Sequence, residues 1–142
     1  MSVNRGLSPT QRTLRACRDA GRFVDKCERW NPYGGARKPD GSAIGIRQDL
    51  FGFVDIVALD DAIVAIQCCA GSGHAAHRQK IIESEYAAAW LRAGGQIEIW
   101  SWRKVKVKRR GKLERWQPRV EYITNETLQS KGTQDGNGND QE

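Results

Sequence analysis

The pattern of polar and apolar positions predicts a capped helix near the start of the chain. Residues 8–11 (SPTQ) are typical of a helix start, because serine caps the first turn and glutamine three residues later completes a capping box. We expect this helix to run to about Ala20. Gly21 then stands where helices commonly end in a left-handed residue.

Three segments follow that have the alternation or the length of β-strands. Residues 23–30, 51–59 and 63–69 are the expected strands, and an Asp-Asp turn joins the second to the third. Residues 31–48, between the first two strands, are rich in Gly and Pro and predict a long loop. A loop of that length in a compact domain is usually functional or mobile.

A second helix and a hairpin are expected further along the chain. Residues 74–93 place apolar side chains at helical spacing, and two glycines follow them. Residues 97–102 predict a fourth strand. Residues 113–124 predict its hairpin partner, in which Pro118 favours an edge position because it has no N–H to donate.

This order of elements favours an α/β fold with a central mixed β-sheet of four or five strands and helices packed on its faces. Residues 1–124 are expected to form a single domain. Residues 125–142 are polar, rich in Gly and almost free of apolar side chains, which predicts a disordered tail.

Charge is distributed unevenly along the chain. The formal net charge is +6, yet residues 49–75 contain four Asp and no Lys or Arg. A basic body attracts a polyanion such as nucleic acid, and an acidic island within it is where a divalent cation is expected. A soluble protein with a basic surface and an exposed acidic turn explains the same composition.

Other protein classes have little support in the composition. No apolar run approaches the ~20 residues that a membrane helix needs, so no membrane partner is expected. The first residues lack the apolar segment of a secretory signal, which predicts a cytoplasmic protein. The four cysteines, at positions 17, 27, 68 and 69, show no CxxC spacing and are expected to be free thiols.

Polar residues within two of the apolar strands carry the candidate chemistry. Asp55 lies within residues 51–59, and Gln67 shares one face of the next strand with Cys69. Burying an ionised Asp or an amide without a partner is unfavourable, so Asp55 and Gln67 are expected to converge. A Mg²⁺ ion there would take oxygen atoms from both side chains, from the backbone near Cys68, from water and from a substrate phosphate.

The order helix, three strands, helix, strand, with an Asp on the second strand, resembles the PD-(D/E)xK nuclease superfamily over roughly residues 8–103. The form it resembles is that of the archaeal Holliday-junction resolvases and small phage nucleases. Residues 52–55 (GFVD) match the Asp motif, and residues 66–69 (IQCC) fall where the superfamily has an apolar residue, Glu, any residue and Lys. The resemblance implies a restriction-endonuclease-like core and phosphodiester hydrolysis that depends on Mg²⁺ or Mn²⁺. By analogy with the resolvases, it also implies a homodimer.

Two positions depart from that motif, because Gln67 replaces the acid and Cys69 replaces the lysine. An amide offers a metal an oxygen but no negative charge, so other carboxylates are needed. Asp49, near Asp55 in sequence, and Glu28, on the first strand, are the candidates. The expected metal ligands are therefore Asp55, Gln67, Asp49 and Glu28.

The missing cation is expected from the helix after the third strand. Lys80 is the first candidate, and Arg78 and Lys26 are alternatives. The catalytic set implied by the resemblance is then Asp55, Gln67, Lys80 and Cys69.

Two other interpretations of the same residues remain open. Cys68 or Cys69 with His74 and His77 would suit zinc, although the spacing is not a recurrent zinc spacing and adjacent strand residues diverge. Cys69 with one of these histidines would also make a nucleophile–base pair, but no oxyanion-hole motif accompanies it.

Basic residues beside aromatic ones indicate nucleic-acid binding, because they combine phosphate contacts with base stacking. Trp100, Trp102 and Trp116 flank a Lys- and Arg-rich turn over residues 103–112. The expected DNA-binding residues are Arg12, Arg15, Arg47, Arg78, Lys104, Lys106, Lys108, Arg109 and Arg110. The predicted function is a metal-dependent endonuclease acting on double-stranded, branched or phage DNA. The alternative is a catalytically inactive DNA- or RNA-binding module that retains the fold.

Overall fold

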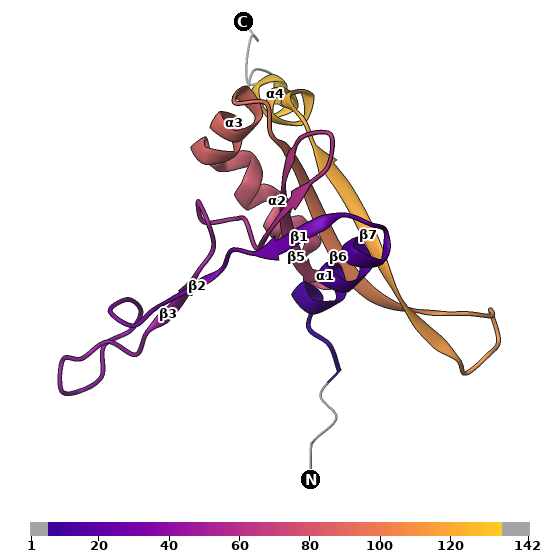
Figure 1. The fold of residues 1–142 in the computed structure, drawn as a ribbon, viewed down its shortest axis with the longest axis horizontal. Helices are drawn as coiled ribbons and strands as arrows, with labels where there is room; N and C mark the ends of the chain where they lie inside the picture. The colour runs from indigo at the N-terminus through magenta and orange to yellow at the C-terminus, as the bar shows by residue number, and fades with distance from the viewer. Residues whose placement is uncertain (1–5, 135–142) are drawn as a thin grey trace, which may run out of the picture.

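The computed structural model describes residues 6–134 and shows a mixed α/β fold around one five-stranded sheet (Figure 1). Across the sheet, the strands are β1 (Phe23–Lys26), β4 (Ile56–Leu59), β5 (Ile63–Ala70), β6 (Gln96–Lys106) and β7 (Glu114–Ile123). β5 and β6 run parallel, and the other neighbouring strands of this sheet pair in antiparallel fashion. This confirms the expected α/β class with a mixed central sheet flanked by helices.

The first helix, α1 (Pro9–Asp19), begins with the expected capping box. The backbone N–H of Gln11 donates to Ser8 Oγ at 3.2 Å, and the backbone N–H of Ser8 donates to Gln11 Oε1 at 2.9 Å. Gly21 follows the helix with a φ of 83°, a conformation that glycine adopts without strain. The predicted start and end of this helix are confirmed.

The parallel pair β5–β6 needs a crossover connection, and helices on one face of the sheet supply it. After the short 3₁₀ turn η1 (Gly71–Gly73), the chain forms α2 (His74–Glu83) and α3 (Glu85–Arg92). The expected single helix over residues 74–93 is therefore two helices. The break falls at Ser84, whose ψ of 124° is extended, and no Gly or Pro marks it in the sequence.

The two faces of the sheet bury separate apolar clusters. On one face, Cys17 of α1 is buried against Ile56, Val64 and Ile66. On the other face, α2, α3 and α4 (Asn125–Gln134) cover a cluster that includes Ala65, Cys69 and Ile99, with Leu128 of α4 packed at its margin. No helix in the described part of the chain is long and apolar enough to cross a membrane.

The helix α4 corrects the expectation that the tail is disordered from residue 125. Leu128 is partly buried against the sheet, and that packing accounts for a helix where the composition suggests none. The hydroxyls of Thr124 and Thr127 lie 3.2 Å apart where α4 begins. Residues 135–142, the rest of the expected tail, lie outside the described residues.

Two arms extend from this body on opposite sides (Figure 1). One is the far end of the β6–β7 hairpin. The other is a separate two-stranded ribbon of β2 (Arg29–Asn31) and β3 (Ile46–Gln48), which occupies the segment expected to be a loop. The expected first strand over residues 23–30 is consequently divided between the central sheet and this arm.

The expected second strand, residues 51–59, is shorter than its apolar run suggests. Its first half is a turn in which the N–H of Gly52 donates to Asp49 O at 3.1 Å and the N–H of Val54 donates to Leu50 O at 3.0 Å. β4 begins only at Ile56. Asp55 therefore lies immediately before the first residue of β4 and not in the middle of a strand.

Candidate functional site

Asp55 lies where the turn over residues 50–54 meets β4, and it is 7% exposed. Its backbone N–H donates to Ile66 O at 2.9 Å, which aligns the residue with β5. Its Oδ2 atom accepts two hydrogen bonds, from Gln67 Nε2 at 2.7 Å and from the backbone N–H of Cys68 at 2.8 Å. The structure thus brings Asp55 and Gln67 together, as the strand pattern predicts.

Burial raises the pKa of Asp55 to about 7. The N–H of Cys68 acts in the opposite direction, but the neighbouring carboxylates of Asp49 and Glu28 raise the pKa further. Three acidic side chains from different segments therefore act on one another at this point. The ionised form of Asp55 is unfavourable here unless positive charge is supplied.

The amide oxygen of Gln67 is buried and has no hydrogen-bond partner among the described residues. Gln67 is 2% exposed, so water does not reach it freely. An ionised Asp55 can only accept hydrogen bonds, so the Gln67 N–H₂ group must face it. The Gln67 carbonyl oxygen therefore points away from Asp55. A buried amide oxygen without a partner is unfavourable by about 1–3 kcal/mol.

Glu28 and Lys80 approach the same region from different elements. Glu28 forms ion pairs with Lys26 at 3.4 Å and with Arg47 at 3.9 Å. Burial lowers the pKa of His77, and the Lys80 ammonium lowers it further, whereas the Asp49 carboxylate raises it. Lys80 and Asp49 are therefore both near His77. Lys80 and Asp49 also line one cavity of about 460 Å³.

Cys69 does not supply the chemistry of the lysine expected at its position from the resemblance. It is 5% exposed and packs in the apolar cluster beneath α2 and α3. Burial raises the pKa of its thiol, and the charge of Asp55 adds to the effect. The side chain is therefore a neutral thiol at physiological pH, which disfavours a role as nucleophile.

The donor set suits Mg²⁺ or Mn²⁺ better than zinc. Among the described residues, no group of three or more His, Cys, Asp or Glu side chains is arranged to hold a metal ion. Mg²⁺ commonly uses one or two carboxylates and keeps several waters, whereas structural zinc needs four protein ligands. Asp55 fits the first pattern, and the Gln67 amide would add an oxygen on turning over, because in this structure its N–H₂ group faces Asp55. Asp49 and Glu28 add negative charge close by.

The alternative zinc set is not brought together. Cys68 packs against α1 with Cys17, while Cys69 packs on the opposite face of the sheet. His74 is also occupied, because its Nδ1 lies 2.7 Å from Ser101 Oγ and its Nε2 lies 2.7 Å from Glu121 Oε1.

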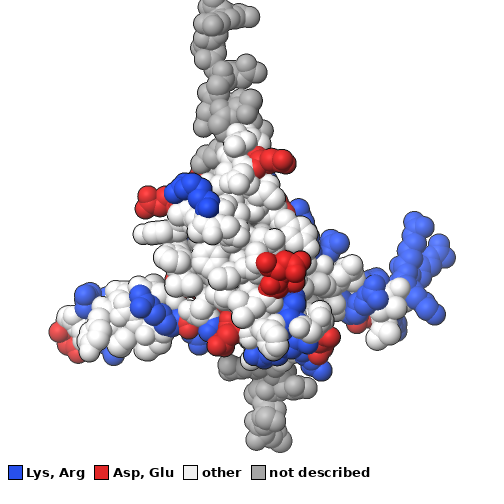
Figure 2. All heavy atoms as spheres, turned by 45° about the horizontal axis from the view of Figure 1, so that its top comes forward, with Lys and Arg blue, Asp and Glu red and all other residues white. Residues whose placement is uncertain are grey.

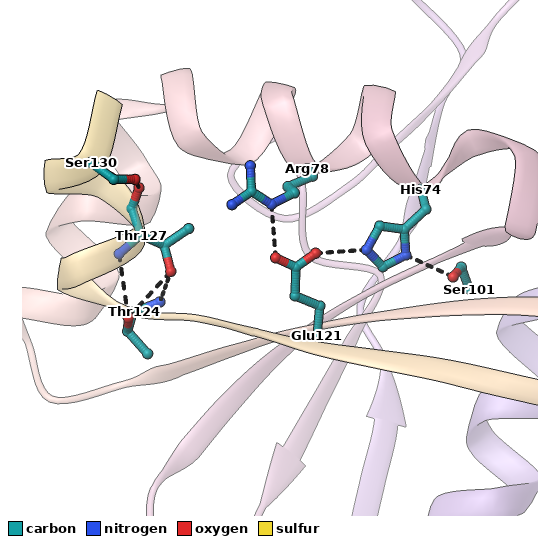
Figure 3. A network of polar contacts seen from close by, with 7 residues as sticks. All are labelled: His74, Arg78, Ser101, Glu121, Thr124, Thr127 and Ser130. Atoms are coloured by element: carbon teal, nitrogen blue, oxygen red, sulfur yellow. Dashed lines mark hydrogen bonds and ion pairs between the residues drawn. The ribbon is translucent and has the colours of Figure 1, made fainter. Parts of the chain in front are cut away.

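His74 belongs to a network that the sequence pattern did not reveal (Figure 3). Arg78, one turn further along α2, donates from Nε to Glu121 Oε2 at 2.7 Å. Burial raises the pKa of Glu121, but hydrogen bonds from Arg78 and His74 outweigh it and hold the pKa below its usual range. The network joins α2 to β6 and β7. It also makes Arg78 a structural ion-pair partner, which leaves Lys80 as the cation of α2 beside Asp49.

A signal for this network exists in the sequence. Ser101 and Glu121 occupy positions of β6 and β7 whose side chains face α2, where apolar residues are the rule. His74 and Arg78 are four residues apart and so share one face of the helix. Matching the two pairs requires the register of the hairpin, which the sequence does not display.

The expected DNA-binding residues divide between the body and the arms. Lys and Arg side chains gather at the end of the β6–β7 hairpin in Figure 2, where Lys104, Lys106, Lys108, Arg109 and Arg110 are exposed. Arg12 of α1 stacks on the ring of Trp116 at 3.9 Å, and the Lys104 ammonium lies 5.3 Å from the same ring. Arg15 is exposed on α1, and Arg47 is exposed at the base of the β2–β3 arm.

Arg22, which follows α1, forms a buried ion pair, unlike the exposed Arg15 of α1. Its guanidinium donates two hydrogen bonds of 3.0 Å to the carboxylate of Glu98, which is 4% exposed. Trp100 Nε1 also donates to that carboxylate, at 2.9 Å. Arg22 therefore neutralises a buried acid on β6.

Comparison with protein-family models, with curated proteins and with solved structures found no match to this chain.

Proposed function

We propose that this protein is a metal-dependent DNA endonuclease whose site is centred on Asp55. The observation that carries the proposal is the pairing of a buried carboxyl, its pKa raised to about 7, with a buried amide oxygen that has no partner in the described part of the chain. A divalent cation would relieve both, because it favours the ionised carboxylate and, once the Gln67 amide has turned over so that its oxygen faces Asp55, accepts that oxygen as a ligand.

The residues around Asp55 have distinct tasks in this proposal. Asp55 and Gln67 would hold Mg²⁺ or Mn²⁺, with Asp49 and Glu28 adding negative charge. A bound cation of this kind polarises a phosphate and lowers the pKa of a bound water. Lys80, exposed beside Asp49, would contact the substrate phosphate. Cys69 would only fill space beneath α2.

Charge on the arms supports a nucleic-acid substrate. The hairpin end carries five of the expected phosphate-binding residues, and Arg47 adds another at the base of the second arm. Contacts from such arms position a duplex without reading its sequence. DNA, double-stranded or branched, is therefore the proposed substrate.

A catalytically inactive DNA- or RNA-binding module is the second candidate, and one observation favours it. Among the described residues no cluster of three metal-ligating acids, histidines or cysteines exists, and the two motif positions after Asp55 hold Gln67 and Cys69. Such a module would keep the basic arms and bind DNA without metal.

The test is cleavage of supercoiled plasmid and of a four-way junction in Mg²⁺, Mn²⁺ or EDTA, with Asp55→Ala beside the unaltered protein. Asp61→Ala, which removes an exposed Asp in the β4–β5 turn, is the matched control. Cleavage that needs metal and Asp55, and that survives Asp61→Ala, supports the endonuclease. Absence of cleavage, with DNA binding that ignores both EDTA and Asp55→Ala, rejects it in favour of the binding module.

A further inference from the structure

Two exposed aromatic side chains and one partly buried one form a group beside the candidate site, here named the aromatic platform (Phe51, Tyr86 and Trp90). The rings of Phe51 and Tyr86 stack with centroids 5.5 Å apart and an interplanar angle of 28°. Trp90 meets Phe51 at 6.3 Å and is held by a hydrogen bond from its Nε1 to Gln96 O at 2.9 Å. Phe51 is 48% exposed and Tyr86 49%, so the stacked pair presents ring surface to solvent.

The backbone holds Phe51 outward in an unfavourable conformation. Its φ of 53° is left-handed, and it is the only described residue other than glycine with a positive φ. Such a conformation in a bulky residue is unfavourable by about 1–3 kcal/mol and persists where the surroundings impose it. Here the hydrogen bonds of the turn impose it, with Leu50 and Val54 exchanging N–H···O bonds of 3.1 and 3.0 Å.

A cavity lined partly by charged residues and a cavity lined by apolar residues meet at this platform. One, of about 460 Å³, is lined by Phe51 and Tyr86 together with Arg29, Arg47, Asp49 and Lys80. The other, of about 280 Å³, is lined by the three aromatic rings and two alanines of α3 and its C-cap. A ligand that fits both must combine a flat apolar surface with negative charge.

We propose that the aromatic platform stacks an unpaired nucleobase of single-stranded DNA while Arg29, Arg47 and Lys80 hold the adjacent phosphates. An exposed ring stacks on any base, but only an unpaired base can leave its own helix to meet it. This inference rests on the proposed function, because the same cavity contains Asp49 and borders the site of Asp55. It deepens that function by naming a single-stranded segment as the part of the substrate bound there.

The experiment measures binding by the full chain in EDTA, so that cleavage does not interfere. The probe is a single-stranded oligodeoxynucleotide with one 2-aminopurine, compared with a blunt duplex of the same sequence. Quenching of the 2-aminopurine fluorescence reports stacking. We expect quenching and tighter binding for the single strand, and a decrease in affinity of about tenfold when either ring is removed.

The variants are chosen so that they fold. Phe51→Gly removes the ring and places at φ 53° a residue that adopts this angle without strain. Tyr86→Ala removes an exposed ring from α3 and inserts a strong helix former. Tyr86→Phe, the conservative control, keeps the ring and is expected to bind and quench like the unaltered protein.

Each outcome has a distinct meaning. Quenching that disappears in Phe51→Gly and Tyr86→Ala but persists in Tyr86→Phe supports the platform. Equal binding of duplex and single strand, unchanged by either ring removal, overturns this inference and leaves the endonuclease intact. Failure to bind any DNA overturns this inference together with the proposed function.

Discussion

Gln67 donates its amide N–H to Asp55 across two strands at 2.7 Å, while its own oxygen lies buried without a partner among the described residues. In the proposed endonuclease, this pair stands where two acids are expected. The Gln67 amide carries no charge, so it cannot offset the charge of a metal ion, but it still offers an oxygen atom. The pair therefore gains a hydrogen bond in the absence of metal, which two carboxylates would lack.

An acid at position 67 is expected to lower the stability of the metal-free protein and to raise its affinity for a divalent metal. Without metal, Gln67→Glu places two carboxyls in contact, so it should lower the free energy of unfolding by about 1–3 kcal/mol at neutral pH. With Mn²⁺, its melting temperature should rise more than that of the unaltered protein. Thermal denaturation with and without Mn²⁺ measures both effects.

The control for that experiment is Gln67→Met, which has a similar length and no oxygen. It should show a smaller response to Mn²⁺ than the unaltered protein. If Gln67→Glu responds to Mn²⁺ no more than Gln67→Met does, the position does not face a cation.

The pH dependence of stability should report the protonation of Asp55. The folded pKa of about 7 lies above the ordinary value of 3.8, so protonated Asp55 favours the folded state. That contribution is fully present below pH ~4 and disappears as the pH rises through ~7, each pKa unit being worth about 1.4 kcal/mol.

Asp55→Asn mimics the protonated carboxyl and should remove this pH dependence. In urea denaturation without metal, the variant is expected to match the unaltered protein at pH 4 and to be more stable at pH 8. Mg²⁺ should stabilise the unaltered protein at pH 8 and leave Asp55→Asn unchanged. A variant less stable than the unaltered protein at pH 8 would show that the carboxylate is well tolerated at this position.

The buried pair of Arg22 and Glu98 should be a large contributor to stability when only one partner is removed. Arg22→Ala leaves the Glu98 carboxylate buried without its cation, and a decrease of about 3 kcal/mol in the free energy of unfolding is expected in chemical denaturation. Arg15→Ala, an exposed position of α1, should change stability by less than about 0.5 kcal/mol.

A double variant separates charge from packing in that pair. Arg22→Met with Glu98→Gln removes both charges and keeps an acceptor for Trp100 Nε1. It is expected to recover most of the stability that Arg22→Ala removes. A double variant as unstable as Arg22→Ala would mean that neither the unpaired Glu98 charge nor lost packing accounts for the effect, and that the hydrogen bonds of the guanidinium itself do.

The end of the β6–β7 hairpin should contribute salt-dependent affinity for DNA and no preference for a particular DNA sequence. Replacing Lys108, Arg109 and Arg110 by Gln should reduce the slope of log K against log salt by about 0.9 for each phosphate that is no longer neutralised. Fluorescence anisotropy at several salt concentrations measures the slope. Arg92→Gln, on the last turn of α3, is the control and should leave it unchanged.

The elements predicted well are those whose signals are local. The capping box of α1, the strand β5 and the edge position of Pro118 each depend on neighbouring residues, and the structure confirms them. The contact of Asp55 with Gln67 was also predictable, because two polar groups in apolar strands need partners.

The elements predicted poorly depend on contacts between distant segments. Phe51 adopts a left-handed conformation that turns the chain within the apolar residues 51–59. Because position 51 holds no Gly, the sequence does not predict this turn. Helix α4 is held by Leu128 against the sheet, although its composition resembles a disordered tail. The His74–Glu121 contact depends on the hairpin register. Each required a tertiary arrangement that intrinsic propensity does not encode.

The sheet ends on each side in a strand that is poorly suited to receive another chain. β7 carries Pro118, which interrupts its row of backbone donors, and β1 is only four residues long, with Asp25 and Lys26 in it. Such edges oppose the addition of a foreign strand and so protect against fibrous aggregation.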